Sequence, residues 1–182
     1  MPGHDLEALW EAHCRYEFET RDVDATMASM VAEPYVNHVP TMTGGVGHDQ
    51  LKRFYKYHFI GVNPPDFRLT PVSRTVGADR LVDEFIAHFT HTTEIDWMLP
   101  GIPPTGRQVS IPMVAVVQFE ADKLVHEHIY WDQASVLAQI GMLEPRGLPV
   151  AGAETAQKVA DRALPSNTLM RDVWRRSEGK PI

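Results

Sequence analysis

The second half of the chain alternates short β-prone segments with tight turns, and this pattern limits the possible folds more than any other feature. One pair of segments is joined by Gly77-Ala78-Asp79 and a later pair by Ala121-Asp122. Segments joined so closely can pair only as antiparallel neighbours. The sequence therefore predicts an antiparallel sheet, whose four expected strands cover residues 67–76, 81–92, 109–119 and 124–131.

The first half of the chain has the side-chain spacing of helices. Near the N-terminus, side chains recur at helical intervals at Leu6, Leu9, Trp10, His13 and Cys14. Asp5 stands before them as the expected N-cap. A second helix is expected to end at Pro34, a short strand to cover 35–39, and a third helix to cover 51–59. Helices followed by antiparallel strands predict an α+β fold, in which a curved sheet and N-terminal helices enclose a pocket.

Length and composition fit one domain with an extension. The chain has 182 residues, of which 43% are hydrophobic and 23% are charged, close to ordinary globular values. We expect residues 1–143 to form the domain, ending with a helix over 133–140. Proline, glycine and alanine become frequent after it. Residues 144–182, with one helix near 154–163, are expected to be an extension that packs on the domain or on a partner subunit.

Charge and cysteine content narrow the classes of partner. The net charge of −7 argues against a nucleic-acid partner, because phosphate binding needs a basic surface. No apolar stretch approaches the roughly 20 residues that span a bilayer, and the N-terminus lacks the pattern of a signal peptide. Cys14 is the single cysteine, which rules out an internal disulfide and suits a reducing compartment. We therefore expect a cytoplasmic protein with neither a membrane nor a nucleic-acid partner.

Three stretches resemble the SnoaL-like polyketide cyclase branch of the nuclear-transport-factor-2-like superfamily. Residues 101–107 resemble its "PPTG(R/K)" loop, residues 111–131 its next hairpin, and residues 131–141 its "D…L.QLG" ending. The resemblance implies a nuclear-transport-factor-2-like cone. A partial likeness to the limonene epoxide hydrolases lies in Tyr35-Val36-Asn37, since those enzymes hold the attacking water with a Tyr-x-Asn element and a carboxylate. Their Arg-x-Asp pair is not found here.

The resemblance implies that Asp132 is a general acid/base. Loss of hydration beside aromatic residues would raise the pKa of its carboxyl group toward neutrality. The alternative is that Asp132 only caps the helix that follows. Strand side chains alternate, so His126, His128 and Tyr130 share a face with Asp132, and we expect this face to line the pocket. Alternatively, these histidines lie on a wet sheet face or at a dimer contact.

Other expected site residues come from both halves of the chain. Tyr35 and Asn37 share a strand face and are expected to orient a water or a carbonyl oxygen toward Asp132; alternatively, Asn37 satisfies a backbone group at a strand end. His128 joins them in the expected catalytic set. The expected substrate contacts are Tyr130, His126, His88, Trp97 and Phe54.

These residues suggest a cofactor-free acid/base enzyme whose substrate is a small hydrophobic molecule, cyclic or carbonyl-bearing. The reaction would be an isomerisation, cyclisation, dehydration or hydrolysis. Two alternatives stay open. The first is a non-catalytic ligand-binding or oligomerisation domain. The second is a metal enzyme that uses His126-x-His128 with His88, His91 or Glu84. No glycine-rich nucleotide loop is present. A homodimer is expected, because open curved sheets cover their outer face with a second copy.

Overall fold

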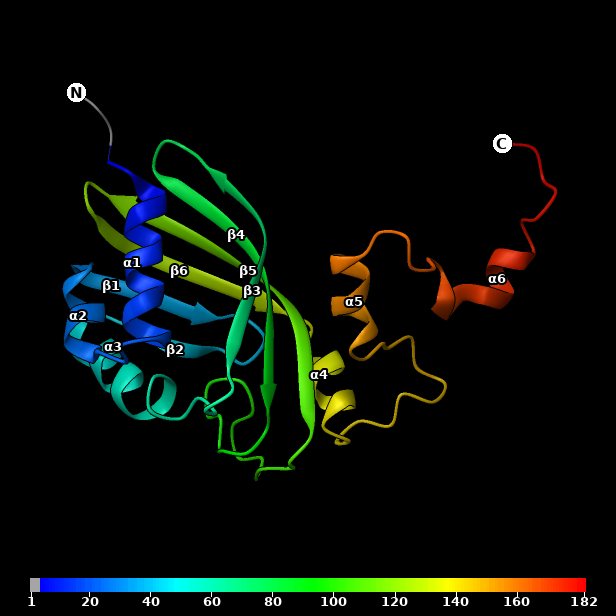
Figure 1. Cartoon of the computed structure of the whole chain (residues 1–182), viewed down its shortest axis with the longest axis horizontal. Coiled ribbons are helices and arrows are strands. Elements are labelled where there is room, and N and C mark those ends of the chain that lie inside the picture. The colour runs from blue at the N-terminus through cyan, green and yellow to red at the C-terminus, as the bar shows by residue number, and fades with distance from the viewer. Residues whose placement is uncertain (1–3) are drawn as a thin grey trace.

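The computed structural model describes residues 4–182 and contains one curved six-stranded sheet with helices on both sides (Figure 1). The strands are β1 (Met30–His38), β2 (Thr43–Val46), β3 (Arg68–Val76), β4 (Arg80–Thr90), β5 (Gln108–Glu120) and β6 (Lys123–Trp131). Their order in the sheet is β2-β1-β6-β5-β4-β3. All neighbours are antiparallel except β1 and β6, which run parallel. The expected α+β class and the four expected antiparallel strands are confirmed.

The helices that precede strand β3 cover the concave side of the sheet, which we call the inner face. They are α1 (Leu6–Phe18), α2 (Val23–Ala28), α3 (His48–Phe54) and the π-helical turn η1 (Tyr55–Phe59). Asp5 and Asp22 cap the first two, each accepting a hydrogen bond from a backbone N–H three residues on. The expectation that Pro34 ends the second helix is wrong. That helix ends at Ala28, and Pro34 lies within β1 where the register with β6 shifts, a position that tolerates its missing N–H.

Each long strand has one buried face and one more exposed face, because successive side chains of a strand point to opposite sides of the sheet. Along β5, every second residue from Val109 to Phe119 is buried against the inner core. The residues between them, such as Val114 and Val116, belong to the opposite side of the sheet, which we call the outer face. The segment between β4 and β5 is also buried at Ile95, Trp97, Met98 and Leu99.

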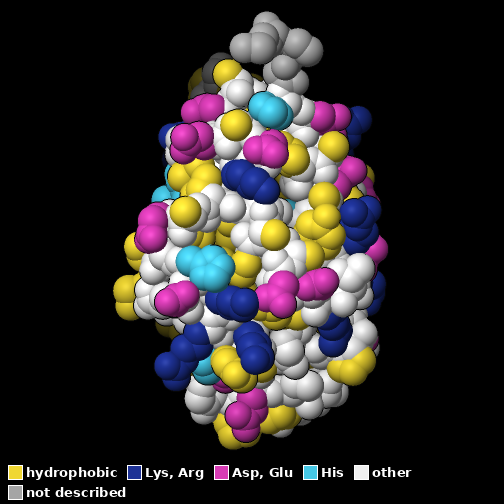
Figure 2. Space-filling model, turned by 90° about the vertical axis from the view of Figure 1, so that its left-hand side faces the viewer, with side chains coloured by type: hydrophobic (Ala, Val, Ile, Leu, Met, Phe, Trp, Pro, Cys, Tyr) yellow, Lys and Arg dark blue, Asp and Glu magenta, His cyan; other side chains and the backbone are white. Residues whose placement is uncertain are grey.

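The chain after β6 lies on the other side of the sheet. Helix α4 (Gln133–Gln139) and helix α5 (Glu154–Ala160) pack against β5, and beyond them the turn η2 (Thr168–Met170) and helix α6 (Arg171–Arg175) extend away from the body (Figure 1). No helix in residues 4–182 has the length and apolarity needed to span a bilayer. The opposite end of the molecule carries interspersed acidic, basic and hydrophobic side chains (Figure 2).

Candidate functional site

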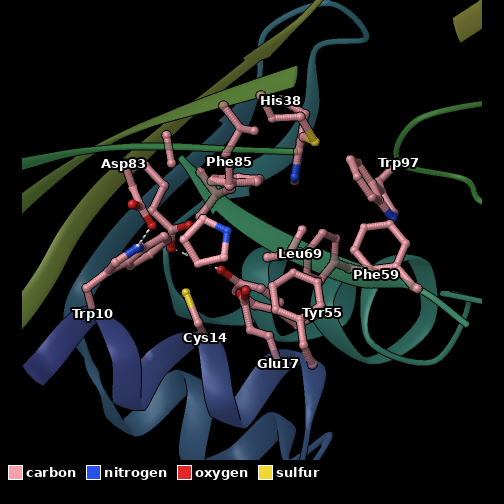
Figure 3. A pocket seen from close by; sticks show the side chains of 18 of the residues that line it. Trp10, Cys14, Glu17, His38, Tyr55, Phe59, Leu69, Asp83, Phe85 and Trp97 are labelled. Carbon is pink, nitrogen blue, oxygen red and sulfur yellow. Dashed lines mark hydrogen bonds between the residues drawn. The ribbon is translucent and has the colours of Figure 1, made fainter. Parts of the chain in front are cut away.

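A cavity of about 180 Å³ lies between helix α1 and the inner face of the sheet (Figure 3). Its wall is largely aromatic and aliphatic, with a few polar groups. The lining residues are Trp10, Cys14, Glu17, Phe18, Val36, His38, Tyr55, Phe59, Phe67, Leu69, Pro71, Arg74, Asp83, Phe85, Trp97, Met113, Ala115, Glu127 and Ile129. A concave, mostly apolar cavity with a few converging polar groups is the usual form of a small-molecule site.

Helix α1 supplies the polar wall of this pocket. His13 and Glu17 are four residues apart, so they share the helix face that turns toward the sheet. Both side chains are buried, with exposed fractions of 0% and 4%. Figure 3 shows Cys14 and Glu17 reaching from α1 into the pocket, with His38 on the opposite side. Of this pair, Glu17 lines the pocket, and His13 contacts Glu17 from outside the lining.

His13 lies between two carboxylates. Its Nε2 atom is 3.1 Å from Oε1 of Glu17 and 3.2 Å from Oε1 of Glu127, which comes from strand β6. Its Nδ1 atom is 2.7 Å from the hydroxyl oxygen of Ser29, which donates its own proton to the carbonyl of Thr26. Because that hydroxyl proton is used, Nδ1 is the donor, and Nε2 can donate to the carboxylates. The geometry is that of a buried imidazolium held by two glutamates.

The electrostatics agree with this assignment. Burial opposes the charged form of His13, but the charges of Glu17 and Glu127 outweigh it and raise the pKa of His13 to about 10. Burial raises the pKa of the Glu17 carboxyl group above its ordinary value, and the neighbouring His13 partly offsets this effect. A carboxyl group with a raised pKa in an apolar cavity can take up and release a proton closer to neutral pH. Glu17 is therefore the best-placed acid/base group in the pocket.

Tyr55 and Cys14 complete this wall in their protonated forms. The Tyr55 hydroxyl donates to Oε1 of Glu127 at 3.2 Å. Burial, reinforced by the charges of Glu127 and Glu17, raises the pKa of Tyr55 well above its usual range. Burial likewise raises the pKa of the Cys14 thiol. Tyr55 thus remains a hydrogen-bond donor, and Cys14 lacks the thiolate character of a nucleophile.

A second charged pair at the pocket edge is already saturated. Arg74 on β3 donates from Nε and Nη2 to the two oxygens of Asp83 on β4, both at 3.0 Å. The indole of Trp10 donates to the same carboxylate at 2.8 Å. The remaining Nη1 of Arg74 donates to Glu7 and Glu11. This network fixes α1 on the sheet and leaves neither Arg74 nor Asp83 free to bind a charged ligand.

His38 lies across the pocket from Glu17 and is neutral. Burial among aromatic rings, including Trp97 at 4.9 Å between ring centroids, lowers the pKa of His38 to about 4. Its Nδ1 atom is 3.3 Å from the carbonyl oxygen of Thr43, which can only accept. Nδ1 therefore carries the proton, and Nε2 is left with a lone pair. His38 can accept a hydrogen bond from a bound molecule.

The loop before β5 closes one side of the cavity through Trp97. The backbone carbonyl of Trp97 accepts hydrogen bonds from the hydroxyls of Thr41 and Thr43, at 2.7 and 2.8 Å. Its indole donates to the side-chain oxygen of Asn63 at 2.9 Å. These bonds hold the Trp97 ring against His38 and Phe59. The expected placement of Trp97 at the pocket agrees with this geometry.

The expected site residues on β1 and β6 do not line the pocket, because the opposite face of each strand does. On β6, Glu127 and Ile129 point into the pocket, so His126, His128 and Tyr130 lie on the outer face. On β1, Val36 and His38 point inward, so Tyr35 and Asn37 also lie on the outer face. There the His126 and His128 rings stack at 4.6 Å, and Tyr35 contacts His128 edge-on at 5.4 Å.

Asp132 does not line the pocket. Its carboxylate is exposed and accepts hydrogen bonds from the backbone N–H groups of Ala134 and Ser135, at 2.9 and 3.3 Å. It is thus the N-cap of α4, the alternative use that Asp commonly has.

Two expected substrate contacts also lie outside the pocket wall. His88, with its Nδ1 2.9 Å from the Ser110 hydroxyl oxygen, is on the outer face, and Phe54 packs in the core behind His38.

The alternative of a metal site at His126 and His128 finds no third ligand among the described residues. In residues 4–182, the three side chains able to hold a metal ion together are His13, Glu17 and Glu127, whose ligand atoms lie within 4.8 Å of one another. His126 and His128 are not part of such a group. Any metal at the pocket cluster would have to displace the proton from Nε2 of His13.

Comparisons with known proteins agree with this architecture. The family model described as "SnoaL-like domain" matches residues 10–127, and no curated protein matches the chain. A candidate SnoaL-like polyketide cyclase from Shewanella putrefaciens is 15% identical, with a TM-score of 0.63 over 79% of this chain and 88% of that one. TsrD from Streptomyces laurentii is 17% identical, with a TM-score of 0.60 over 76% and 96%.

A nuclear-transport-factor-2-like protein of unknown function from Burkholderia pseudomallei is 20% identical, with a TM-score of 0.55 over 74% of this chain and 95% of that one. Identities this low establish a shared fold and nothing about chemistry. The expected cone of the nuclear-transport-factor-2-like type is confirmed.

Proposed function

Because the chain belongs to the SnoaL-like family, whose model spans residues 10–127, we propose that its enclosed pocket is the active site of an acid/base enzyme. The observation that carries the proposal is the buried Glu17 carboxyl group, which lines an apolar cavity and has a raised pKa. A base of this kind can remove a proton from a carbon atom next to a carbonyl group. The reaction class is enolisation, as in an isomerisation or an aldol-type ring closure.

The roles of the neighbouring groups follow from their protonation states. Glu17, as the carboxylate, takes the proton from the carbon atom. When substrate binds, the protonated Tyr55 hydroxyl turns from Glu127 and donates instead to the oxygen on which negative charge develops. Glu17 then returns the proton, to a carbon atom in an isomerisation or to the new alkoxide oxygen in an aldol-type ring closure, so that no net change in charge remains. Glu127 holds His13 in place, and the imidazolium of His13 favours the ionised form of Glu17.

The size and polarity of the pocket limit the substrate. A cavity of roughly 150 Å³ holds benzene, so about 180 Å³ accommodates one ring with small substituents. Arg74 is the guanidinium in the lining, and it is occupied by Asp83, Glu7 and Glu11. An anionic substrate would therefore find no free cation there. The proposed substrate is an uncharged, single-ring carbonyl compound.

We expect the enzyme to catalyse exchange of α-protons for deuterons in single-ring ketones and enones, and to leave fused multi-ring ketones unchanged, because the latter exceed the cavity. The measurement is proton NMR in deuterated water with a panel of both kinds of compound. Binding of single-ring compounds without exchange would favour a ligand-binding domain instead. Equal exchange of three-ring and single-ring ketones would contradict the size argument.

A further inference from the structure

The C-terminal segment 165–182, here called the C-terminal arm, is separate from the rest of the molecule. In Figure 1 it extends beyond α5, away from the sheet. Within residues 4–182, its hydrogen bonds and its single ion pair, Arg175 to Asp172, all join residues of the arm to one another. Among the described residues, no hydrogen bond or ion pair therefore holds the arm on its own domain.

The arm nevertheless has the composition of a packed segment. Trp174 is 50% exposed, and the other large apolar side chains left open to solvent are Leu169, Met170, Val173 and Ile182. Contiguous apolar side chains of this size are uncommon on a free surface and mark sites of interaction. The arm holds four basic and two acidic residues, so its net charge is +2. Because the whole chain has a net charge of −7, the rest of the chain has a net charge of −9. The positively charged arm is thus complementary to the negatively charged domain of a second copy of this chain.

The outer face of the sheet is only partly covered. Helix α4 covers the end near Ser110, where the Gln139 side chain exchanges hydrogen bonds with the Ser110 backbone N–H and carbonyl at 2.8 and 3.1 Å. Away from this end, the face exposes the large side chains of Tyr35, Val46, Val82 and Tyr130. Tyr130 is 44% exposed, and the His126–His128 stack lies beside it on β6.

We infer that the C-terminal arm packs its apolar side chains on the outer sheet face of a second copy of this chain, in a twofold exchange. The arm leads away from its own outer face, so a second copy is the partner that brings a matching apolar surface and a net negative body. In a twofold dimer each copy gives one arm and receives one, which covers both apolar surfaces at once. This assembly is independent of the chemistry proposed for the pocket.

The test is sedimentation velocity of the full-length protein over a range of concentrations, with single substitutions on each proposed surface. We expect a dimer, and we expect Trp174→Asp on the arm and Tyr130→Asp on the face each to weaken it by at least about tenfold, because buried aromatic anchors dominate interface energy. Tyr57→Asp is the matched control, since Tyr57 is an aromatic residue on η1 that is 57% exposed and lies outside both surfaces.

Cross-linking locates the contact. A photoreactive phenylalanine analogue replaces Trp174 in isotopically light chains, which are mixed with heavy full-length chains. Links from position 174 to β1, β4 or β6 of the heavy chain are the expected result. A monomer at every concentration, a dimer that Trp174→Asp leaves unchanged, or links confined to one chain would overturn the inference. Each variant is compared with the wild type by circular dichroism, so that misfolding is not mistaken for dissociation.

Discussion

Replacing Glu17 by glutamine is expected to reduce the rate of α-proton exchange by a factor of about 10² to 10⁴, the usual contribution of a positioned acid/base group. Glutamine keeps the size of the side chain and an oxygen that can accept from Nε2 of His13, but it cannot take up a proton. The fold should therefore survive while the exchange is lost. The measurement is the initial rate of deuterium incorporation into the best single-ring ketone, for the wild type and for Glu17→Gln.

Glu19→Gln is the matched control for this prediction. Glu19 lies two residues further along, at the C-cap of α1, and is exposed, so the same chemical change there leaves the pocket intact. The wild-type rate is expected for this control. An unchanged rate in Glu17→Gln would mean that Glu17 is not the base. Glu127 would then be the next carboxylate to test.

His13→Leu is expected to lower the free energy of unfolding by about 3–5 kcal/mol, the cost of removing one partner from a buried ion pair. Leucine has no charge to offset the two glutamates that lie within 3.2 Å of Nε2, so both would be buried without their cation. Chemical denaturation at pH 6 gives the comparison. His48→Leu, at an exposed histidine on α3, should change the free energy of unfolding little.

The same experiment has a pH dependence with a definite sign. The pKa of His13 is raised from 6.5 to about 10 in the folded protein, so the folded state binds an extra proton between these values. The stabilisation from His13 is complete below pH 6.5 and is lost as the pH rises toward 10, by at most about 1.4 kcal/mol per pH unit for one proton. His13→Leu should remove this slope. A wild-type stability that stays level from pH 6.5 to 10 would contradict the buried imidazolium.

The fold followed from the sequence where local signals and tertiary packing agreed. The turns at residues 77–79 and 121–122 fixed two hairpins, and the capping of α1 by Asp5 was evident from residue type. The end of the second helix was missed because proline breaks helices and is also accepted at a strand irregularity. Only the pairing of β1 with β6 places Pro34 in a strand.

The expected site residues on β1 and β6 lie on the outer face of the sheet and not on the pocket face. A strand alternates its side chains between two faces, but the alternation alone does not say which face is inside. On β6 the row of His126, His128 and Tyr130 is the more polar one, and polarity alone favours it as the pocket wall. The buried row instead holds Glu127 between aliphatic and aromatic neighbours.

A usable signal was nevertheless present in the sequence. His13 and Glu17 stand four residues apart on the otherwise apolar stripe of the first helix, and Glu127 stands among apolar residues on its strand face. Buried ionisable groups are costly unless they pair, so three of them on otherwise apolar faces indicate one shared cluster. The distances between them required the packing of α1 against β6, which no local pattern specifies.

The most direct test of the pocket assignment is the exchange rate of Asp132→Asn, measured beside the wild type and Glu17→Gln. Asparagine also caps helices well, so the α4 cap should be retained in this variant. Because the Asp132 carboxylate is exposed and lies outside the pocket, the predicted rate is that of the wild type within about a factor of two. A decrease of the exchange rate by a factor of 10² or more in Asp132→Asn, with the rate of Glu17→Gln unchanged, would contradict the assignment and identify Asp132 as the acid/base group.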